Sequence, residues 1–291
     1  MYKPVQLVEQ EIQLAVQRAL EEDVGTGDAT TQSVIPDGAT AVAEMRAREE
    51  LVVCGVEFVR ITCEQVDEDL VLNFTHTDGD MLEPGDCIVR IEGNAASILT
   101  AERTALNFIQ RLSGIASLTQ RYVDRIAGTK AQVLDTRKTT PGWRHFEKYA
   151  VACGGATNHR IGLFDQIMIK DNHLATLGPD PATTIPLAIQ KAKTMYPKLK
   201  IEVEADTLEQ AYIAMDSGAD ILLLDNMPPE KLKQAVDKNK GRCLLEASGG
   251  IHLETIRQVA ESGVDFISVG ALTHSAPAVD IALDFQLPPL E

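Results

Sequence analysis

The sequence predicts an α/β protein in two parts, a small α+β unit followed by a (β/α) barrel that is complete or partial. Short apolar runs alternate with helical stretches from residue 131 onward, whereas residues 1–95 lack this rhythm. At least the last four runs recur at intervals of roughly 20 residues, the length of one strand–helix step. Six or more such steps favour a barrel over an open sheet.

The α+β unit is expected to open with a helix, because apolar residues from Val5 to Leu20 recur at helical spacing. β-like segments follow at 39–47, 51–59 and 70–76, although 51–59 could equally begin a helix. The turn sequences DGD and EPGD then predict a hairpin whose second strand is CIVRIEG.

A helical stripe begins at Ser97, and we expect Gly114 to interrupt it, with a second helix starting at Ile115. Arg103 and Arg111 lie on another face of the first helix. From spacing alone, that face is interpreted as an ordinary solvated stripe.

The barrel strands are predicted from six short runs, and helix signals such as Pro228–Pro229 and Gly263 punctuate the segments between the later ones. The alternating tail VDIALDF predicts a last strand that packs on the first domain. No GxGxxG follows a strand, which argues against dinucleotide binding. The six runs are AQVLDT, QIMIK, KIEVEA, DILLLDN, CLLEAS and DFISVG.

Composition narrows the functional class. The formal net charge is −16, which argues against nucleic acid and anionic membrane surfaces as partners. No apolar run approaches the roughly 20 residues of a membrane span, and the first 20 residues lack the pattern of a signal peptide. The five cysteines are odd in number, widely spaced and free of CxxC, which predicts reduced thiols in a cytoplasmic protein.

Residues 135–173 form a cationic island in this acidic chain, with six Lys and Arg against four Asp and Glu, and three of the six histidines. A solvated basic surface is the plain alternative. We favour a pocket for a small polyanion, because the basic residues lie beside turns and strand ends instead of forming a run.

Each predicted barrel strand ends in a polar or small residue, and these ends converge on one rim of a barrel. Glu204 and Asp225 at neighbouring strand ends could hold Mg²⁺, directly or through water. Glu202 points to the same strand face as Glu204, one layer deeper. Alternatively, Lys138 or Lys170 could form a Schiff base with a substrate.

Several segments together resemble the quinolinate phosphoribosyltransferase family, the carboxylating nicotinate-nucleotide pyrophosphorylases. The resemblance covers nearly the whole length, and DTRKTTPG, NHR and KDNH in this order are specific motifs. The other matching segments are ERTALNFIQRLSG, EKYAVACGGATNHRIGL, IEVEADTLEQA, ILLLDN, EASGGI and ISVGALTHSAP.

The resemblance implies an N-terminal α/β sandwich domain over residues 1–114, joined by the tail 276–291, and an incomplete (β/α) barrel over 115–275. It implies phosphoribosyl transfer from 5-phosphoribosyl 1-diphosphate to quinolinate with decarboxylation, giving nicotinate mononucleotide, CO2 and diphosphate in de novo NAD biosynthesis. Mg²⁺ is the implied cofactor, and a homodimer or higher homo-oligomer with shared active sites is the implied assembly.

The resemblance also implies residue roles, and these revise the solvated reading of Arg103, which should enter the neighbouring subunit's site. Lys138, Lys170, Glu204 and Asp225 should be catalytic, and Glu204 and Asp225 should also face the metal. The implied substrate-binding residues are Arg103, Arg137, Thr139, His159, Arg160, Lys170, Glu204, Asp225, Ser248, Gly249, Gly250, Gly270 and His274.

Three alternatives stay open on the sequence. The first is a related phosphoribosyltransferase with another heterocyclic acid as acceptor, against which Arg103, Arg137 and Arg160 together favour a dicarboxylate. The second is a non-catalytic phosphosugar-binding protein. The third is a Schiff-base aldolase, which borohydride trapping would reveal.

Overall fold

The computed structural model describes residues 4–286 of the chain, and its contacts divide it into two compact units. We call residues 121–144 and 156–274 the barrel unit, and residues 5–120, 145–155 and the chain from 275 onward the antiparallel unit. The segment 145–155 therefore groups with residues far from it in sequence. The domain limits 1–114 and 115–275 stay a prediction, and positions 287–291 of the predicted tail lie outside the described residues.

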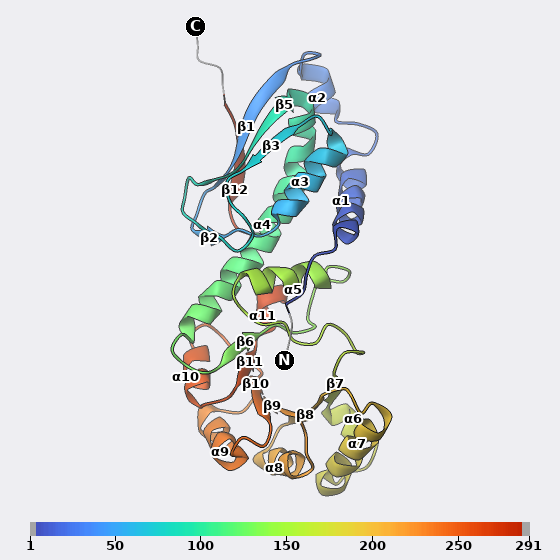
Figure 1. Cartoon of the computed structure of the whole chain (residues 1–291), viewed down its shortest axis with the longest axis vertical. Coiled ribbons are helices and arrows are strands. Elements are labelled where there is room, and N and C mark those ends of the chain that lie inside the picture. The colour runs from blue at the N-terminus through green and yellow to red at the C-terminus, as the bar shows by residue number, and fades with distance from the viewer. Residues whose placement is uncertain (1–3, 287–291) are drawn as a thin grey trace. The chain divides into compact units, whose positions relative to one another are not determined.

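The antiparallel unit is built on a four-stranded sheet in the order β12-β1-β5-β3, with a separate β2-β4 pair (Figure 1). Its apolar core joins β1 and β5 to helices α3 and α4, as the buried Met45, Ile91, Val59 and Ile109 show. The elements are α1 (Glu9–Val24), α2 (Ala29–Val34), β1 (Thr40–Ala47), β2 (Leu51–Val52), α3 (Val56–Val66), β3 (Val71–Phe74), β4 (Met81–Leu82), β5 (Cys87–Asn94), α4 (Ala95–Arg125), α5 (Arg144–Cys153) and β12 (Ile281–Phe285).

Helix α4 corrects one expectation, because it runs without interruption through Gly114. Glycine inside a helix costs about 1 kcal/mol relative to alanine, so its presence there needs a cause. A Cβ atom at residue 114 would overlap the carbonyl oxygen of Pro277 and lie 3.2 Å from Cα of Ala278. The glycine thus allows the chain after residue 275 to cross the helix at close range.

The tail beyond that crossing forms β12, as its alternating pattern predicted. β12 pairs antiparallel with β1, with Met45 opposite Leu283 and Ala47 opposite Ile281. The ambiguous segment 51–59 divides into both of its alternatives, because β2 occupies its start and α3 begins at Val56.

The barrel unit holds a six-stranded parallel sheet in the order β6-β11-β10-β9-β8-β7, and all six predicted strands are present. β6 and β7 are the two edge strands, so the strand pairing in the described chain does not close, which confirms the incomplete barrel (Figure 1). The elements are β6 (Gln132–Leu134), β7 (Ile167–Ile169), α6 (Asp171–Ala175), α7 (Pro181–Met195), β8 (Ile201–Ala205), α8 (Leu208–Asp216), β9 (Ile221–Asp225), α9 (Pro229–Asn239), β10 (Leu244–Ser248), α10 (Ile256–Glu261), β11 (Phe266–Ser268) and α11 (Ala271–His274).

Local sequence explains where the barrel helices begin. Thr207 caps α8 by accepting a hydrogen bond from the backbone N–H of Gln210, whose side chain caps Thr207 in return. Proline occupies the first turn of α7 and of α9, where no N–H is needed. Among residues 4–286, no helix combines the length and apolar character that crossing a bilayer would require.

Candidate active site

A cavity of about 420 Å³ opens at the carboxyl ends of the barrel strands. Residues that alternate along β8, β9 and β10 face it, because side chains two positions apart share one face of a strand. Four cations and three carboxylates line it. The lining residues are Thr136, Arg137, Lys138, His159, Arg160, Met168, Lys170, Glu204, Leu223, Asp225, Glu246, Ser248 and Ser268.

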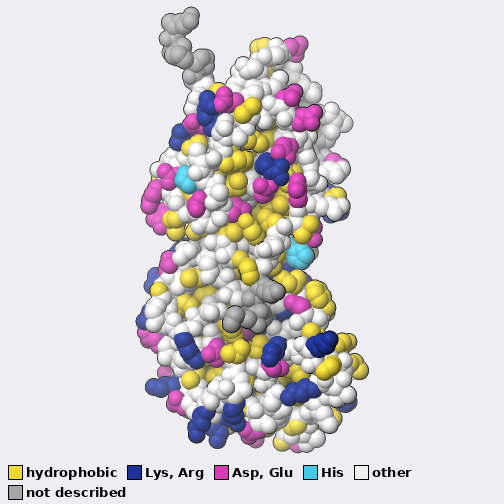
Figure 2. All heavy atoms as spheres, in the orientation of Figure 1, with side chains coloured by type: hydrophobic (Ala, Val, Ile, Leu, Met, Phe, Trp, Pro, Cys, Tyr) yellow, Lys and Arg dark blue, Asp and Glu magenta, His cyan; other side chains and the backbone are white. Residues whose placement is uncertain are grey.

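Eight of the predicted site residues are among those that line the cavity. Thr139 lies directly after the lining residue Lys138, and Gly249 and Gly250 directly follow Ser248. On the face drawn in Figure 2, several Lys and Arg side chains lie on the barrel unit. The eight residues are Arg137, Lys138, His159, Arg160, Lys170, Glu204, Asp225 and Ser248.

The motifs DTRKTTPG and NHR meet through Asp135, a fully buried residue at the end of β6. One carboxylate oxygen of Asp135 accepts the backbone N–H of His159 at 2.7 Å, and the other accepts Nδ2 of Asn158 at 2.8 Å. Arg144 makes a second link, donating to the Thr139 hydroxyl and to the Ile161 carbonyl, both at 3.1 Å. These bonds hold the two cation-bearing loops together.

Two arginines supply donors at the cavity. Nε of Arg137 is buried and has no hydrogen-bond partner within residues 4–286. A buried guanidinium donor without a partner costs free energy, so a ligand acceptor would be favourable here. Arg160 is 8% exposed and donates through NH1 to the Gln166 carbonyl at 3.1 Å, which fixes the direction of its side chain.

Lys170 and Glu204 form an ion pair across the ends of β7 and β8. Asp225 lies on the neighbouring strand β9, and its pKa is raised by burial and by the charges of Glu204 and Asp206. Crowded carboxylates of this kind are stabilised by an added cation. Mg²⁺ is commonly held by one or two carboxylates together with substrate phosphates, so Glu204 and Asp225 fit this ion.

The turn after β10 is shaped by its two glycines, which both have positive φ, +91° at Gly249 and +59° at Gly250. A Cβ at Gly249 would overlap the side chain of Asn226, which donates to Asp225 at 2.7 Å. The turn therefore packs directly against the end of β9.

Gly270 allows a second close approach. A Cβ there would lie 3.1 Å from both Nε2 of His274 and Cδ of Lys138. His274 and Lys138 thus converge on the turn that follows β11.

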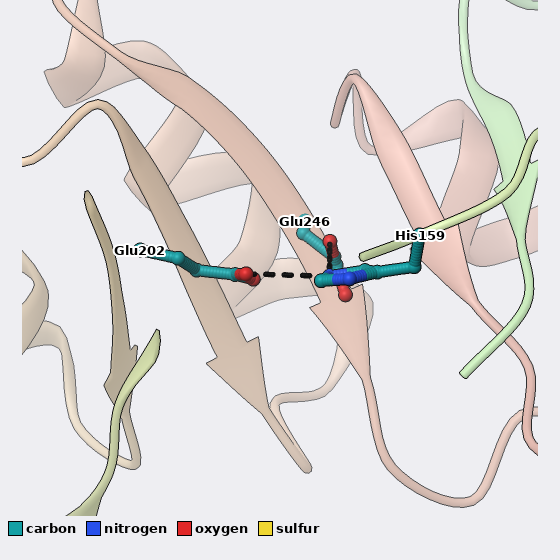
Figure 3. Close-up of side chains that lie close together, drawn as sticks. All are labelled: His159, Glu202 and Glu246. Atoms are coloured by element: carbon teal, nitrogen blue, oxygen red, sulfur yellow. Dashed lines mark ion pairs between the residues drawn. The ribbon is translucent and has the colours of Figure 1, made fainter. Parts of the chain in front are cut away.

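His159, Glu202 and Glu246 form a buried cluster at the floor of the cavity (Figure 3). Nε2 of His159 lies 3.2 Å from Glu202 and 3.3 Å from Glu246. Although burial lowers the pKa of His159, the two carboxylates raise it to about 10. The pKa of Glu202 is raised to about 7 by burial and by the charge of Glu246.

The tautomer of the ring follows from its other nitrogen. Nδ1 of His159 accepts the backbone N–H of Arg160 at 2.7 Å, so Nδ1 carries no proton in this arrangement. In the neutral ring the proton is therefore on Nε2, which faces the two carboxylates. These three residues are the only metal-ligand-like group among the described residues. A protonated Nε2 cannot bind a metal, so we assign them an ion-paired cluster.

Glu246 and Ser268 were not singled out from the sequence, although Glu246 lies in the quoted segment EASGGI. The available signal was strand alternation, because Glu246 shares the inward face with Ser248. A carboxylate within the apolar run CLLEAS can be buried on the inward face of the strand only if a polar or charged side chain pairs with it.

Arg103 lies on α4 in the antiparallel unit and is exposed. It lines a separate cavity of about 300 Å³, together with Asp28 and Thr100. It is not one of the residues around the 420 Å³ cavity.

Known proteins match this chain over nearly its whole length. The family model "Quinolinate phosphoribosyl transferase, N-terminal domain" matches residues 28–113, and the corresponding C-terminal domain matches residues 115–284. A probable carboxylating nicotinate-nucleotide pyrophosphorylase of Bacillus subtilis is 42% identical over 267 residues, covering 91% of this chain and 90% of its own. The carboxylating enzyme of Mycobacterium leprae is 41% identical over 276 residues, covering 92% of this chain and 95% of its own.

Solved structures of such enzymes have the same fold. The nicotinate-nucleotide pyrophosphorylase of Francisella tularensis superposes with a TM-score of 0.93 at 39% identity, covering 98% of this chain and all of that one. The fold and the cavity define an α/β-barrel enzyme. The chain belongs to the quinolinate phosphoribosyltransferase family.

Proposed function

We propose that the chain transfers the phosphoribosyl group of 5-phosphoribosyl 1-diphosphate to quinolinate and releases CO2 and diphosphate, giving nicotinate mononucleotide for NAD biosynthesis. The relatives named above support the reaction class. The observation that carries the proposal is the cavity lined by Arg137, Lys138, Arg160 and Lys170, in which Nε of Arg137 has no partner among the described residues. Both substrates are polyanions.

Quinolinate carries two adjacent carboxylates, and the donors on one side of the cavity suit them. Arg137, His159, Arg160 and Lys170 bind this dianion, since a guanidinium can donate two parallel hydrogen bonds to one carboxylate. Lys138 lies between the two substrates. A monocarboxylate acceptor would leave part of this cation set without a counter-charge, which disfavours it.

The phosphoribosyl donor occupies the opposite side of the cavity. Ser248, Gly249, Gly250 and Gly270 present backbone N–H groups to phosphate, with Thr139 and His274 beside them. Glu204 and Asp225 face the ribose and would hold Mg²⁺, which would supply positive charge for the substrate's diphosphate. The ion would neutralise charge on that leaving group.

The chain's own residues account for the charge changes of the reaction. Loss of diphosphate leaves positive charge on the ribose ring, which the carboxylates of Glu204 and Asp225 stabilise. The ring nitrogen of quinolinate then forms the new bond to the ribose. When the neighbouring carboxylate leaves as CO2, the electron pair stays on the ring carbon beside the pyridinium nitrogen and takes up a proton. Lys138 and Arg137 stabilise that negative charge.

We further propose a homo-oligomer in which Arg103 completes the site of a neighbouring subunit. Its exposure on α4 supports a role toward another chain. The widely spaced cysteines support the cytoplasm as the location.

The test is a coupled assay of the purified protein with 5-phosphoribosyl 1-diphosphate and Mg²⁺. Quinolinate should be consumed with one CO2 released for each nicotinate mononucleotide formed. Lys138→Ala is the control and should lose the activity. Turnover of nicotinate at a rate comparable to quinolinate, without CO2, would point to the related enzyme with another acceptor.

A further inference from the structure

The buried cluster of His159, Glu202 and Glu246 draws its members from three separate elements. Glu202 comes from β8, Glu246 from β10, and His159 from the loop between α5 and β7 (Figure 3). The Glu202 side chain is fully buried, and that of Glu246 is 1% exposed. His159 and Glu246 line the cavity floor.

This cluster holds the His159 ring at both of its nitrogens. Nε2 lies within ion-pair distance of Glu202 at 3.2 Å and of Glu246 at 3.3 Å, while Nδ1 accepts the N–H of Arg160 at 2.7 Å. Asp135 accepts the backbone N–H of His159. The His159 ring is therefore held by Glu202 of β8, Glu246 of β10 and the N–H of Arg160, and its backbone is held by Asp135.

Glu202 also connects to Arg160. Nε2 of Gln166 donates to the Glu202 carboxylate at 2.6 Å, and the carbonyl of Gln166 accepts NH1 of Arg160 at 3.1 Å. One buried carboxylate thus supports two neighbouring residues that face the cavity.

Two carboxylates in a protein interior are costly, and apolar residues of similar size would often stabilise the fold more. Their presence beside an anion pocket is doubly unfavourable, because their charge repels a bound dianion. A functional role accounts for them, and the contacts above indicate orientation.

We propose that Glu202 and Glu246 are positioning residues that hold His159 and Arg160 in the geometry that binds the two carboxylates of quinolinate. This inference rests on the proposed function, which assigns those two residues to the substrate. Neither glutamate is a catalytic residue, since each acts through His159 or Arg160.

Whether quinolinate affinity rises or falls when a glutamate is neutralised distinguishes a role in orientation from a purely electrostatic effect. Removing a negative charge near the pocket should tighten binding of a dianion if charge alone matters. Loss of orientation should weaken binding instead, even though the pocket becomes more positive. Replacing Glu246 or Glu202 by glutamine keeps the size of the side chain and one acceptor oxygen.

The experiment is calorimetric titration of quinolinate and of 5-phosphoribosyl 1-diphosphate into the wild-type protein, Glu246→Gln and Glu202→Gln. We expect quinolinate affinity to fall about tenfold or more in each variant, the usual scale for a lost supporting contact. Affinity for the phosphoribosyl donor should stay within about twofold, as for an independent site. Asp220→Asn, at the opposite ends of the strands, is the matched control for altered stability.

Nitrogen NMR of the His159 ring supplies a second readout, and should show a changed balance of ring tautomers in both variants. Unchanged or tighter quinolinate binding with an unchanged ring signal would overturn the proposal. So would a stoichiometric metal ion in the purified protein that both variants lose. If the wild-type protein itself does not bind quinolinate, the proposed function fails and not this inference alone.

Discussion

The carbonyl oxygen of Pro277 occupies the space that a side chain at Gly114 would need. We predict that Gly114→Ala destabilises the protein by about 1–3 kcal/mol, because overpacking exceeds the gain of about 1 kcal/mol in helix propensity. Chemical denaturation measures this. Asn107→Ala, at an exposed position of the same helix, should be neutral or slightly stabilising, and equal effects at both positions would contradict the steric explanation.

Arg160→Ala should abolish measurable quinolinate binding, because losing one partner of a closed charge pair costs about 2–5 kcal/mol. Calorimetry would measure the affinity, and circular dichroism would verify the fold. Arg242→Ala removes an arginine from the other end of the same unit, where it pairs with Asp216, and should leave quinolinate affinity unchanged. Full affinity in Arg160→Ala would refute its assignment to the substrate.

Turnover should require Mg²⁺. We expect activity to disappear in excess EDTA and to return when Mg²⁺ is restored, since the paired carboxylates Glu204 and Asp225 need a cation when diphosphate is bound. Asp225→Asn should raise the Mg²⁺ concentration for half-maximal activity. Undiminished turnover in EDTA would remove the metal from the proposal.

Arg103→Ala and Lys138→Ala should each be inactive and should complement each other when mixed. In a mixed dimer one site carries both lesions and the other carries none, so random reassortment restores about a quarter of wild-type activity under closed symmetry. A mixture of Lys138→Ala with Lys170→Ala is the matched control, because both residues line the same cavity and no intact site can form. If verified subunit exchange restores nothing in the first mixture, Arg103 acts within its own chain.

The buried cluster predicts the pH dependence of stability. The pKa of His159 rises from 6.5 to about 10 and that of Glu202 from 4.5 to about 7, so the folded protein binds more protons than the unfolded chain from pH 4.5 to about 10. Stability contributed by the cluster is complete below the unfolded pKa values and declines as pH rises through the folded ones. The free energy of unfolding should therefore fall across this window, and less steeply in His159→Asn. Parallel pH profiles for the two proteins would contradict this.

Strand positions and the polar rim were predictable because they depend on local patterns. An apolar run such as ILLLD is buried on both faces, and strand alternation then places Glu204, Asp225 and Ser248 on one side. The continuous helix through Gly114 was not predictable, since the reason for that glycine is Pro277, far along the chain. The role of Glu246 was hidden in the same way, because its partner His159 comes from a loop.

The pairing of β12 with β1 has a consequence for synthesis on the ribosome. β1 lies between β12 and β5, so until residues 281–285 emerge it is an unprotected sheet edge whose N–H and C=O groups are available to other chains. The sheet of the antiparallel unit is therefore complete only after the whole barrel unit has been translated. We expect nascent chains to be most prone to aggregation during that interval, and chaperone demand should fall once β12 docks.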